Sequence, residues 1–181
     1  MTSPDTPPAF QLPAALLSLG YTLRPETEED TPFLFRLYAS TREAELARMT
    51  GWSAEQKLAF LGQQFTAQRH HYKNFIPNCL CQVIEHDGVP VGRLYLEERV
   101  TQVHITDIAL MSDARGKGVG GAIVEALIEH THALGKALGI FVEKFNPALR
   151  LYRRLGFVEI ADADVYLEME RPCDGTETRV S

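Results

Sequence analysis

The sequence predicts one domain of the α/β (α+β) class, in which strands and amphipathic helices are built around one sheet. Two strand-like runs joined by Asp87-Gly88 predict a hairpin, because Asp-Gly readily adopts the positive φ angles of a two-residue turn. A third strand-like run, 102–111, leads through a glycine-rich turn into an amphipathic helix. The nearly all-apolar run 138–143 follows, and such a run is typical of a strand covered on both faces.

Helix caps and turn residues place the elements of the first half of the chain. Thr27 precedes a segment with acidic residues in its first turn, and Ser53 precedes one with apolar residues near helical spacing; a hydroxyl at either position accepts a hydrogen bond from a first-turn N–H. Pro25 ends the preceding strand, because proline lacks the N–H that a ladder needs. The expected elements are a strand over 21–24, helices from Thr27 to about Ala39 and over 54–73, and hairpin strands over 80–85 and 89–97.

The strand-like run 102–111 changes its apolar phase by one residue. Its apolar residues stand at odd positions up to Ile105 and at even positions from Ile108. A one-residue slip near Asp107 is what a β-bulge produces, and a bulge exposes backbone groups. A strand buried on both faces is the alternative explanation, since Ala109 is apolar as well.

Glycine and proline delimit the elements after the glycine-rich turn. Gly135 is expected to end the helix that follows the turn, because glycine accepts the left-handed conformation that closes a helix. Asn146 is expected to cap a short helix, with Pro147 at its first position and Gly156 just past its end. Strands over 157–159 and 165–170 complete the sheet.

The composition is that of a globular domain, with 45% apolar and 23% charged residues in 181. The net charge of −6 argues against a general nucleic-acid or membrane-surface binder, which needs a basic face. No apolar run reaches the roughly 18 residues of a membrane helix, and no secretory signal is visible, so we expect a cytoplasmic protein. The expected organisation is a flexible N-terminal segment over 1–18, the folded domain over 19–171 and a tail over 172–181.

The three cysteines, Cys79, Cys81 and Cys173, predict neither a disulfide framework nor a metal site. Cys79 and Cys81 stand two apart in a strand, so their side chains share one face, which places them poorly for a disulfide. No second cysteine pair supplies metal ligands, and the adjacent His70 and His71 point to different faces of their helix. We therefore expect thiols in a reducing compartment and no metal.

Residues 115–120 read Arg-Gly-Lys-Gly-Val-Gly and stand between a strand and a helix. Closely spaced glycines let several backbone N–H groups point at one spot, and the helix adds the positive end of its dipole. The turn is therefore expected to bind a phosphate or a pyrophosphate. A Walker A site is excluded, because no Ser or Thr follows the Gly-Lys pair.

A dinucleotide-binding fingerprint also matches, at Gly116, Gly118 and Gly121, with Glu143 placed 22 residues later at a strand end. Four residues separate the strand from the first glycine, where that fingerprint needs a tight turn. Only 38 residues follow Glu143, too few to complete a doubly wound sheet. A nucleotide-dependent oxidoreductase is therefore kept only as an alternative.

Two motifs resemble those of the GNAT family of N-acetyltransferases. Residues 115–120 are similar to its Arg/Gln-x-x-Gly-x-Gly/Ala signature, and the preceding Ile-Ala-Leu-Met, 108–111, resembles its fourth strand. Residues 146–157 are similar to its Asn-x-x-Ala-x-x-x-Tyr-x-x-x-Gly-Phe stretch, with the alanine one residue early. The order of elements over about 20–171 resembles that family as well.

The resemblance implies a GNAT-type mixed, mostly antiparallel sheet with a splayed parallel pair at its centre, flanked by about four helices. It implies acetyl-CoA as co-substrate, bound between strands 103–111 and 138–144, with its pyrophosphate on the N–H groups of 116–120. Main-chain groups of the first strand would pair with the pantetheine arm and polarise the acetyl carbonyl. The residues implied in acetyl-CoA binding are Ile108, Ala109, Leu110, Arg115, Gly116, Lys117, Gly118, Val119, Gly120, Asn146 and Tyr152.

The same resemblance implies direct attack by a primary amine on the thioester. Tyr152 is the expected proton donor, because a phenol with a pKa of about 10 is protonated at pH 7 and can protonate the departing CoA thiolate. The amine must lose a proton before it attacks, and Asp107, Glu97, Glu98 and water are the candidate acceptors of that proton. Asn146 has two candidate roles, as a helix cap and as a hydrogen-bond partner of pantetheine.

Segment 41–75 is expected to form the wall of the acceptor site, because the family varies its substrate there. The acceptor is a small-molecule or peptide amine, and no nucleic acid or membrane is expected as a partner. Dimers are frequent in proteins that this chain resembles, so a homodimer is among the expected states. A non-catalytic acyl-CoA-binding sensor is the alternative within the same fold.

Overall fold

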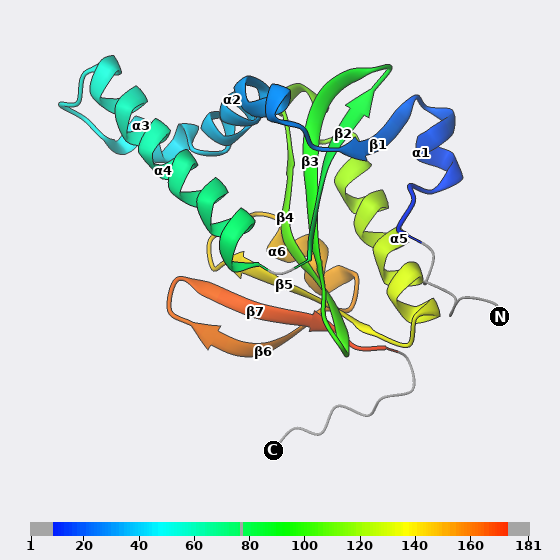
Figure 1. Ribbon diagram of the computed structural model, residues 1–181. Coiled ribbons are helices and arrows are strands. Elements are labelled where there is room, and N and C mark those ends of the chain that lie inside the picture. Colours follow the sequence, from blue (N-terminus) through cyan, green and yellow to red (C-terminus); the bar gives the residue numbers. More distant parts are fainter. Residues whose placement is uncertain (1–8, 77, 174–181) are drawn as a thin grey trace.

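A seven-stranded sheet forms the centre of the molecule (Figure 1). The computed structural model describes residues 9–76 and 78–173. The strand order is β1-β2-β3-β4-β5-β7-β6, and every neighbouring pair is antiparallel except β4 and β5, which run parallel. The strands are β1 Tyr21–Pro25, β2 Cys79–His86, β3 Val89–Glu98, β4 Gln102–Leu110, β5 Ala137–Glu143, β6 Val158–Ala163 and β7 Tyr166–Arg171.

This topology confirms the expected mixed, mostly antiparallel sheet. A doubly wound sheet is built from parallel strands, so the observed arrangement also excludes the fold that a dinucleotide-dependent oxidoreductase would require. The hairpin between β2 and β3 turns at Asp87 and Gly88, which both have positive φ, as the Asp-Gly pair predicts.

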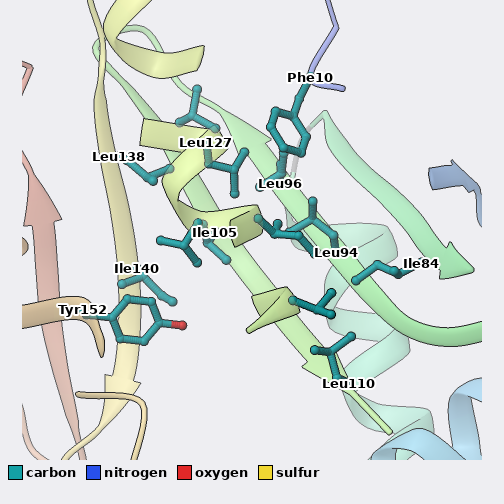
Figure 2. Close-up of a cluster of buried hydrophobic side chains, with 14 of the residues drawn as sticks. Phe10, Ile84, Leu94, Leu96, Ile105, Leu110, Leu127, Leu138, Ile140 and Tyr152 are labelled. Carbon is teal, nitrogen blue, oxygen red and sulfur yellow. The ribbon is translucent and has the colours of Figure 1, made fainter. Parts of the chain in front are cut away.

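Helices cover both faces of the sheet. α1, α5 and α6 pack into the larger apolar core, whereas α2 and α4 form a second core with β2 on the opposite face. Figure 2 shows the larger core, where Leu127 of α5 lies beside Ile105 of β4 and Leu138 of β5. The helices are α1 Ala14–Ser18, α2 Thr31–Thr41, α3 Glu43–Arg48, α4 Ala54–Phe75, α5 Val119–Ala133 and α6 Leu149–Arg154, with short 3-10 turns η1 Glu28–Asp30 and η2 Ser112–Ala114.

Both predicted caps of the first half are present, with one difference in the first. Ser53 and Gln56 form a capping box at the start of α4. Thr27 and Asp30 form another, but the residues after Thr27 first make the 3-10 turn η1. The single helix predicted from Thr27 is therefore two elements, because Pro32 has no N–H to donate to the Glu28 carbonyl, which accepts from the Thr31 N–H in a 3-10 bond instead.

The predicted bulge in β4 is present, and the strand separates from β5 just beyond it. Tyr95 of β3 faces Asp107, whereas Leu96 faces Ile105, so Thr106 is the extra residue. Pairing of β4 with β5 is confined to Gln102–Ile105. The two parallel strands therefore diverge after Ile105, which leaves the backbone of the second half of β4 without a strand on the β5 side.

The segment 1–18 differs from the flexible segment that the sequence predicts. Residues 1–8 lie outside the described residues, but Phe10, Leu12 and Leu16 are buried and join the larger core. Figure 2 shows Phe10 next to Leu96, at the margin of that core. The prediction of a flexible segment rested on the proline-rich composition and did not take these three apolar side chains into account. Their burial stabilises an ordered conformation of residues 9–18, which include α1. Most of the predicted tail, 174–181, also lies outside the described residues.

Candidate functional site

A cavity of about 280 Å³ opens where β4 and β5 diverge. It lies between the carboxyl-terminal half of β4, the end of β5 and the helices α2, α4 and α6. Asp107, Asn146 and Tyr152, which the sequence proposed from three separate segments, all line it. The other residues that line it are Tyr38, Thr41, Arg42, Gln68, Tyr72, Arg93, Ile105, Thr106, Ile108, Ala109, Ile140, Phe141, Val142, Glu143 and Tyr166.

The backbone of β4 presents hydrogen-bonding groups to this cavity. The Met111 N–H donates to the Val91 carbonyl at 2.8 Å, so the pair formed by these two residues is hydrogen-bonded. Because narrow and wide pairs alternate in an antiparallel ladder, Ala109 turns its main-chain groups toward β3, and Ile108 and Leu110 turn theirs away. The main-chain groups of Ile108 and Leu110 therefore face the gap that β5 has left.

The glycine-rich turn stands at the end of β4 and leads directly into α5. Gly116 and Gly118 have φ angles of 71° and 81°, a left-handed conformation that strains any other residue. No atom lies within 4 Å of a Cβ built at either position, so the space beside the turn is open. α5 begins at Val119 with no acidic residue in its first turn. Its free N–H groups and positive dipole end can therefore receive an anion.

The two cations of the turn have different surroundings. The Arg115 Nε donates to the Leu110 carbonyl at 2.7 Å, and its Nη2 donates to the Ser40 hydroxyl at 3.1 Å. Arg115 thus ties the turn to the end of β4 and to α2, a structural role that the sequence did not predict. Lys117 is exposed, and its ammonium has no partner among the described residues. Lys117 is therefore the side chain of the turn that is free to meet a phosphate.

Asn146 makes the side-chain hydrogen bond of a helix cap just ahead of α6. Its Oδ1 accepts a hydrogen bond from the Ala148 N–H at 2.9 Å, and α6 begins only at Leu149. The capping hydrogen bond predicted for Asn146 is therefore present, whereas the regular α-helix starts two residues later than the predicted first position at Pro147. The amide nitrogen of Asn146 has no protein partner among the described residues and lies at the cavity.

The Tyr152 side chain has a buried ring and a hydroxyl that is not hydrogen-bonded to any of the described residues. The side chain is only 5% exposed and packs edge to face against Phe157, with ring centroids 5.4 Å apart. Figure 2 shows the ring next to Ile140, at the end of the apolar cluster. Within the described part of the chain its hydroxyl has no hydrogen-bond partner. Burial, and after it the charge of Asp107, raise the pKa of Tyr152 to about 12, so the phenol is protonated at neutral pH.

Asp107 is held by Tyr72, from the segment 41–75 expected to form the acceptor wall, and by Arg93, which the sequence did not assign to a site. Its Oδ2 accepts a hydrogen bond from the Arg93 Nη2 at 2.5 Å and another from the Tyr72 hydroxyl at 3.0 Å. Burial and the Asp107 charge raise the pKa of Tyr72 well above that of an ordinary phenol. Gln68 accepts a second bond from the Arg93 Nη2, at 3.0 Å. A single arginine within the apolar run of β3 was the signal that could have located this cluster.

Comparison with known protein families identifies the family of this chain. The model of the acetyltransferase (GNAT) family matches residues 34–157, which include both motifs and every residue that lines the cavity except Tyr166. The chain belongs to the GNAT family. No curated protein matches the chain.

Solved structures share this GNAT fold at low sequence identity. The PaiA N-acetyltransferase of Thermoplasma acidophilum, in complex with coenzyme A, is 14% identical, with a TM-score of 0.63 over 84% of this chain and 98% of that one. The ribosomal-protein-S18-alanine N-acetyltransferase of Escherichia coli is 18% identical, with a TM-score of 0.59 over 89% and 99%. An acetyltransferase of Thermus thermophilus is 22% identical, with a TM-score of 0.60 over 85% and 97%.

Other residues that the sequence singled out lie away from the GNAT cavity. Glu97 pairs with Arg99 and Glu98 with Lys136, and neither glutamate lines the cavity. Within segment 41–75, Thr41, Arg42, Gln68 and Tyr72 reach it. Trp52, His70 and His71 do not, and the two histidines lie along a separate groove on α4.

The described residues of this GNAT domain contain no cluster of three or more His, Cys, Asp or Glu side chains that could hold a metal ion. His104 is buried, and burial, followed by the charge of Arg99, lowers its pKa to about 4, so it is a neutral structural residue at pH 7. Among the described helices, none is both long enough and apolar enough to cross a membrane.

Proposed function

We propose that this GNAT protein transfers the acetyl group of acetyl-CoA to a primary amine of a small molecule or peptide by direct attack. One observation carries the proposal. The divergence of β4 and β5 opens a cavity with a protonated, buried Tyr152 inside it, and an open, anion-receptive turn stands at the end of the same strand. The turn suits the pyrophosphate of an acyl-CoA, and the cavity with Tyr152 suits its thioester.

Acetyl-CoA would lie along the second half of β4. Its pyrophosphate would accept hydrogen bonds from the N–H groups of 116–120, with the Lys117 ammonium beside it. The pantetheine amides match the main-chain groups of Ile108 and Leu110, since a peptide-like chain can extend a strand that lacks a neighbour. The Asn146 amide nitrogen is a further donor to the same arm. The Leu110 N–H could polarise the acetyl carbonyl in the manner of an oxyanion hole.

Tyr152 would act as the general acid. When the amine has attacked the thioester, the C–S bond breaks and CoA leaves as a thiolate, which needs a proton. A phenol with a pKa of about 12 is protonated at physiological pH, and the Tyr152 hydroxyl lies at the cavity without a hydrogen-bond partner in residues 9–76 and 78–173. General acid catalysis of this kind contributes roughly 10²- to 10⁴-fold to the rate.

Asp107 would receive the acceptor amine. Its Oδ2 accepts hydrogen bonds from Arg93 and Tyr72, and its other oxygen, which has no hydrogen-bond partner among the described residues, would receive an ammonium or the proton that the amine gives up. Glu97 and Glu98 are less suitable as the base, because neither side chain lines the cavity. Water in the cavity is the alternative base.

The test is release of CoA thiol from acetyl-CoA in the presence of a panel of primary amines, including amino acids, polyamines and peptides. We expect turnover with at least one class. Tyr152→Phe should lower kcat at least tenfold and leave the affinity for CoA within twofold, because the ring stays and only the proton donor is removed. Tyr166→Phe is the matched control, since Tyr166 also lines the cavity but is 40% exposed.

Two outcomes would contradict the proposal. Tight acetyl-CoA binding with no thiol release from any amine would favour the non-catalytic sensor. Thermal stabilisation by NAD(H) but not by acetyl-CoA would remove the assignment of the turn to CoA altogether, because a ligand that binds the folded state raises its stability.

A further inference from the structure

Two thiols lie against one another on β2, outside the proposed acetyl-transfer machinery. The Sγ atoms of Cys79 and Cys81 are 3.2 Å apart, and both side chains are partly exposed. A disulfide has an S–S distance of about 2.05 Å, so the two sulfurs need to approach by only about 1 Å. The separation is smaller than the sequence suggested for two neighbours on one face of a strand.

The backbone also permits a bond between these two sulfurs, but with strain. Residues two apart in a strand have Cα atoms about 6.4–6.8 Å apart, because the rise is about 3.2–3.4 Å per residue. Disulfides usually join Cα atoms about 4.4–6.8 Å apart, so Cys79 and Cys81 stand at the upper end of that range. A disulfide between them would pull the strand together locally, and strain of this kind makes a disulfide easy to reduce.

The surroundings of the two sulfurs differ, and they favour one of the two as a nucleophile. The hydrogen bond between the thiols lowers the pKa of Cys81, and the charges of Arg69 and Arg93 act in the same direction, against burial and Glu26. The same hydrogen bond, followed by burial, raises the pKa of Cys79. The thiolate is the reactive form of cysteine, so Cys81 is the better attacking sulfur and Cys79 the resolving one.

We infer that Cys79 and Cys81 are a site of reversible oxidation by peroxides, at which the two thiols become an intrastrand disulfide. The Cys81 thiolate attacks one oxygen of hydrogen peroxide, the O–O bond breaks, and the departing hydroxide takes a proton to become water. The resulting sulfenic acid is attacked by the Cys79 sulfur, which forms the S–S bond and releases a second water. Two thiols are oxidised, and one peroxide is reduced to two waters.

The site is connected to the cavity through two tyrosines. Cys81 faces Tyr95 across the β2–β3 ladder, and the Tyr95 ring packs edge to face on Tyr72, with centroids 5.4 Å apart. Tyr72 in turn donates to Asp107. Contraction of β2 on oxidation is therefore expected to act on the acceptor side of the cavity, a consequence that rests on the proposed function.

The experiment counts thiols and does not depend on acetyl transfer. The fully reduced chain, freed of reductant, is treated with a few equivalents of hydrogen peroxide, and the remaining thiols are blocked with N-ethylmaleimide. Cleavage after Lys73 and Arg93 gives one peptide, 74–93, that contains both cysteines. We expect two of the three thiols to be lost, with peptide 74–93 lighter by two hydrogens, and dithiothreitol to restore all three.

Matched variants give the experiment its controls. Cys173→Ser removes the third thiol and should leave formation of the disulfide unchanged. Cys79→Ser removes the resolving sulfur, so Cys81 should stop at a sulfenic acid that dimedone traps. Survival of both thiols in peptide 74–93, under conditions that oxidise free glutathione, would overturn the inference, as would oxidation only through disulfide-linked dimers at Cys173.

A separate readout measures the connection to the cavity. If the protein acetylates an amine, we expect oxidation to raise the KM for that amine at least threefold and to leave the KM for acetyl-CoA unchanged. An unchanged acceptor KM in protein shown to carry the disulfide would remove the connection through Tyr95 and Tyr72. Failure of the proposed function would leave the thiol count unaffected.

Discussion

The Arg93 guanidinium donates a 2.5 Å hydrogen bond to Asp107, and this ion pair joins β3 to the bulged part of β4 inside the cavity. Arg93 is 3% exposed in its side chain and Asp107 is 16% exposed. Burial opposes the charge of Arg93, but the neighbouring carboxylate outweighs it and raises the pKa of the guanidinium. The Nε and Nη1 of Arg93 are buried without a hydrogen-bond partner among the described residues. The pair is therefore the main compensation for a buried positive charge.

Arg93→Met is expected to destabilise the fold strongly. Removing one partner leaves the Asp107 carboxylate without its counterion, and breaking a buried pair from one side costs about 3–5 kcal/mol. We expect a loss near the lower bound, about 3 kcal/mol in the free energy of unfolding by urea, because Asp107 keeps some solvent and the Tyr72 hydrogen bond.

The exposed pair Arg153–Glu159 supplies the control for this prediction. Both side chains are about half exposed, so Arg153→Met should change stability by less than about 1 kcal/mol. The double variant Arg93→Met with Asp107→Asn should recover part of the loss, since no unpaired charge remains. Equal losses for Arg93→Met and Arg153→Met would show that the buried pair does not stabilise the fold.

Asp107→Asn is expected to lower kcat/KM for the acceptor amine by roughly 10²-fold, the lower end of what a proton-accepting group contributes. The amide keeps the size of the side chain and can still accept the Tyr72 hydrogen bond, but it carries no charge for an ammonium. The KM for acetyl-CoA should stay within twofold. Steady-state kinetics with both substrates varied gives the two constants separately.

Glu97→Gln is the matched carboxylate control. Glu97 stands on the neighbouring strand, but it pairs with Arg99 and does not line the cavity. We expect it to retain wild-type kinetics. A large loss of kcat/KM in Glu97→Gln, together with wild-type kinetics in Asp107→Asn, would show that Glu97 and not Asp107 receives the amine.

The sequence predicted the elements that depend on local signals. The Asp87-Gly88 hairpin, the Ser53 cap, the phase slip at Thr106 and the glycine at the end of α5 are each encoded in a few adjacent residues, and each is confirmed. The Asn146 cap was predicted as well, but the first residue of α6 was not, because the chain makes a turn over Pro147 and Ala148 before the regular helix starts at Leu149.

The sequence predicted Asp107 and segment 41–75 for the acceptor side of the cavity, but not the cluster that Asp107 forms with Arg93 and Tyr72. Asp107, Arg93 and Tyr72 come from β4, β3 and α4, and only the antiparallel register and the packing of α4 bring them together. A local pattern marks Arg93 only as a polar residue in an apolar strand. The structural role of Arg115 could not be predicted either, since its contact with Ser40 depends on where α2 lies.

Gly118→Ala is expected to weaken CoA binding at least tenfold. Gly118 has a φ of 81° and immediately precedes α5, so a Cβ there strains the turn that aims its N–H groups at the pyrophosphate. Calorimetric titration with CoA measures the affinity. The strain itself costs roughly 1–2 kcal/mol of stability in any left-handed glycine.

Gly51→Ala separates these two effects. Gly51 also has a positive φ, of 94°, with open space where a Cβ would stand, but it lies between α3 and α4, away from the turn. Gly51→Ala should lose similar stability and bind CoA normally. Weakened CoA binding in both variants would mean that general destabilisation, and not the turn, sets the affinity.

The pH profile of acetyl transfer should rise and then stay level up to about pH 10. Tyr152 must be protonated to act as the acid, and burial raises its pKa to about 12, so its contribution is present at lower pH and is lost only as the pH rises through about 12. The amine must be deprotonated to attack, so activity increases with pH until the amine and its base have lost their protons. Measuring kcat between pH 6 and 10 tests this directly. A falling limb centred below pH 9 that disappears in Tyr152→Phe would mean that the phenol ionises far more easily than its burial allows.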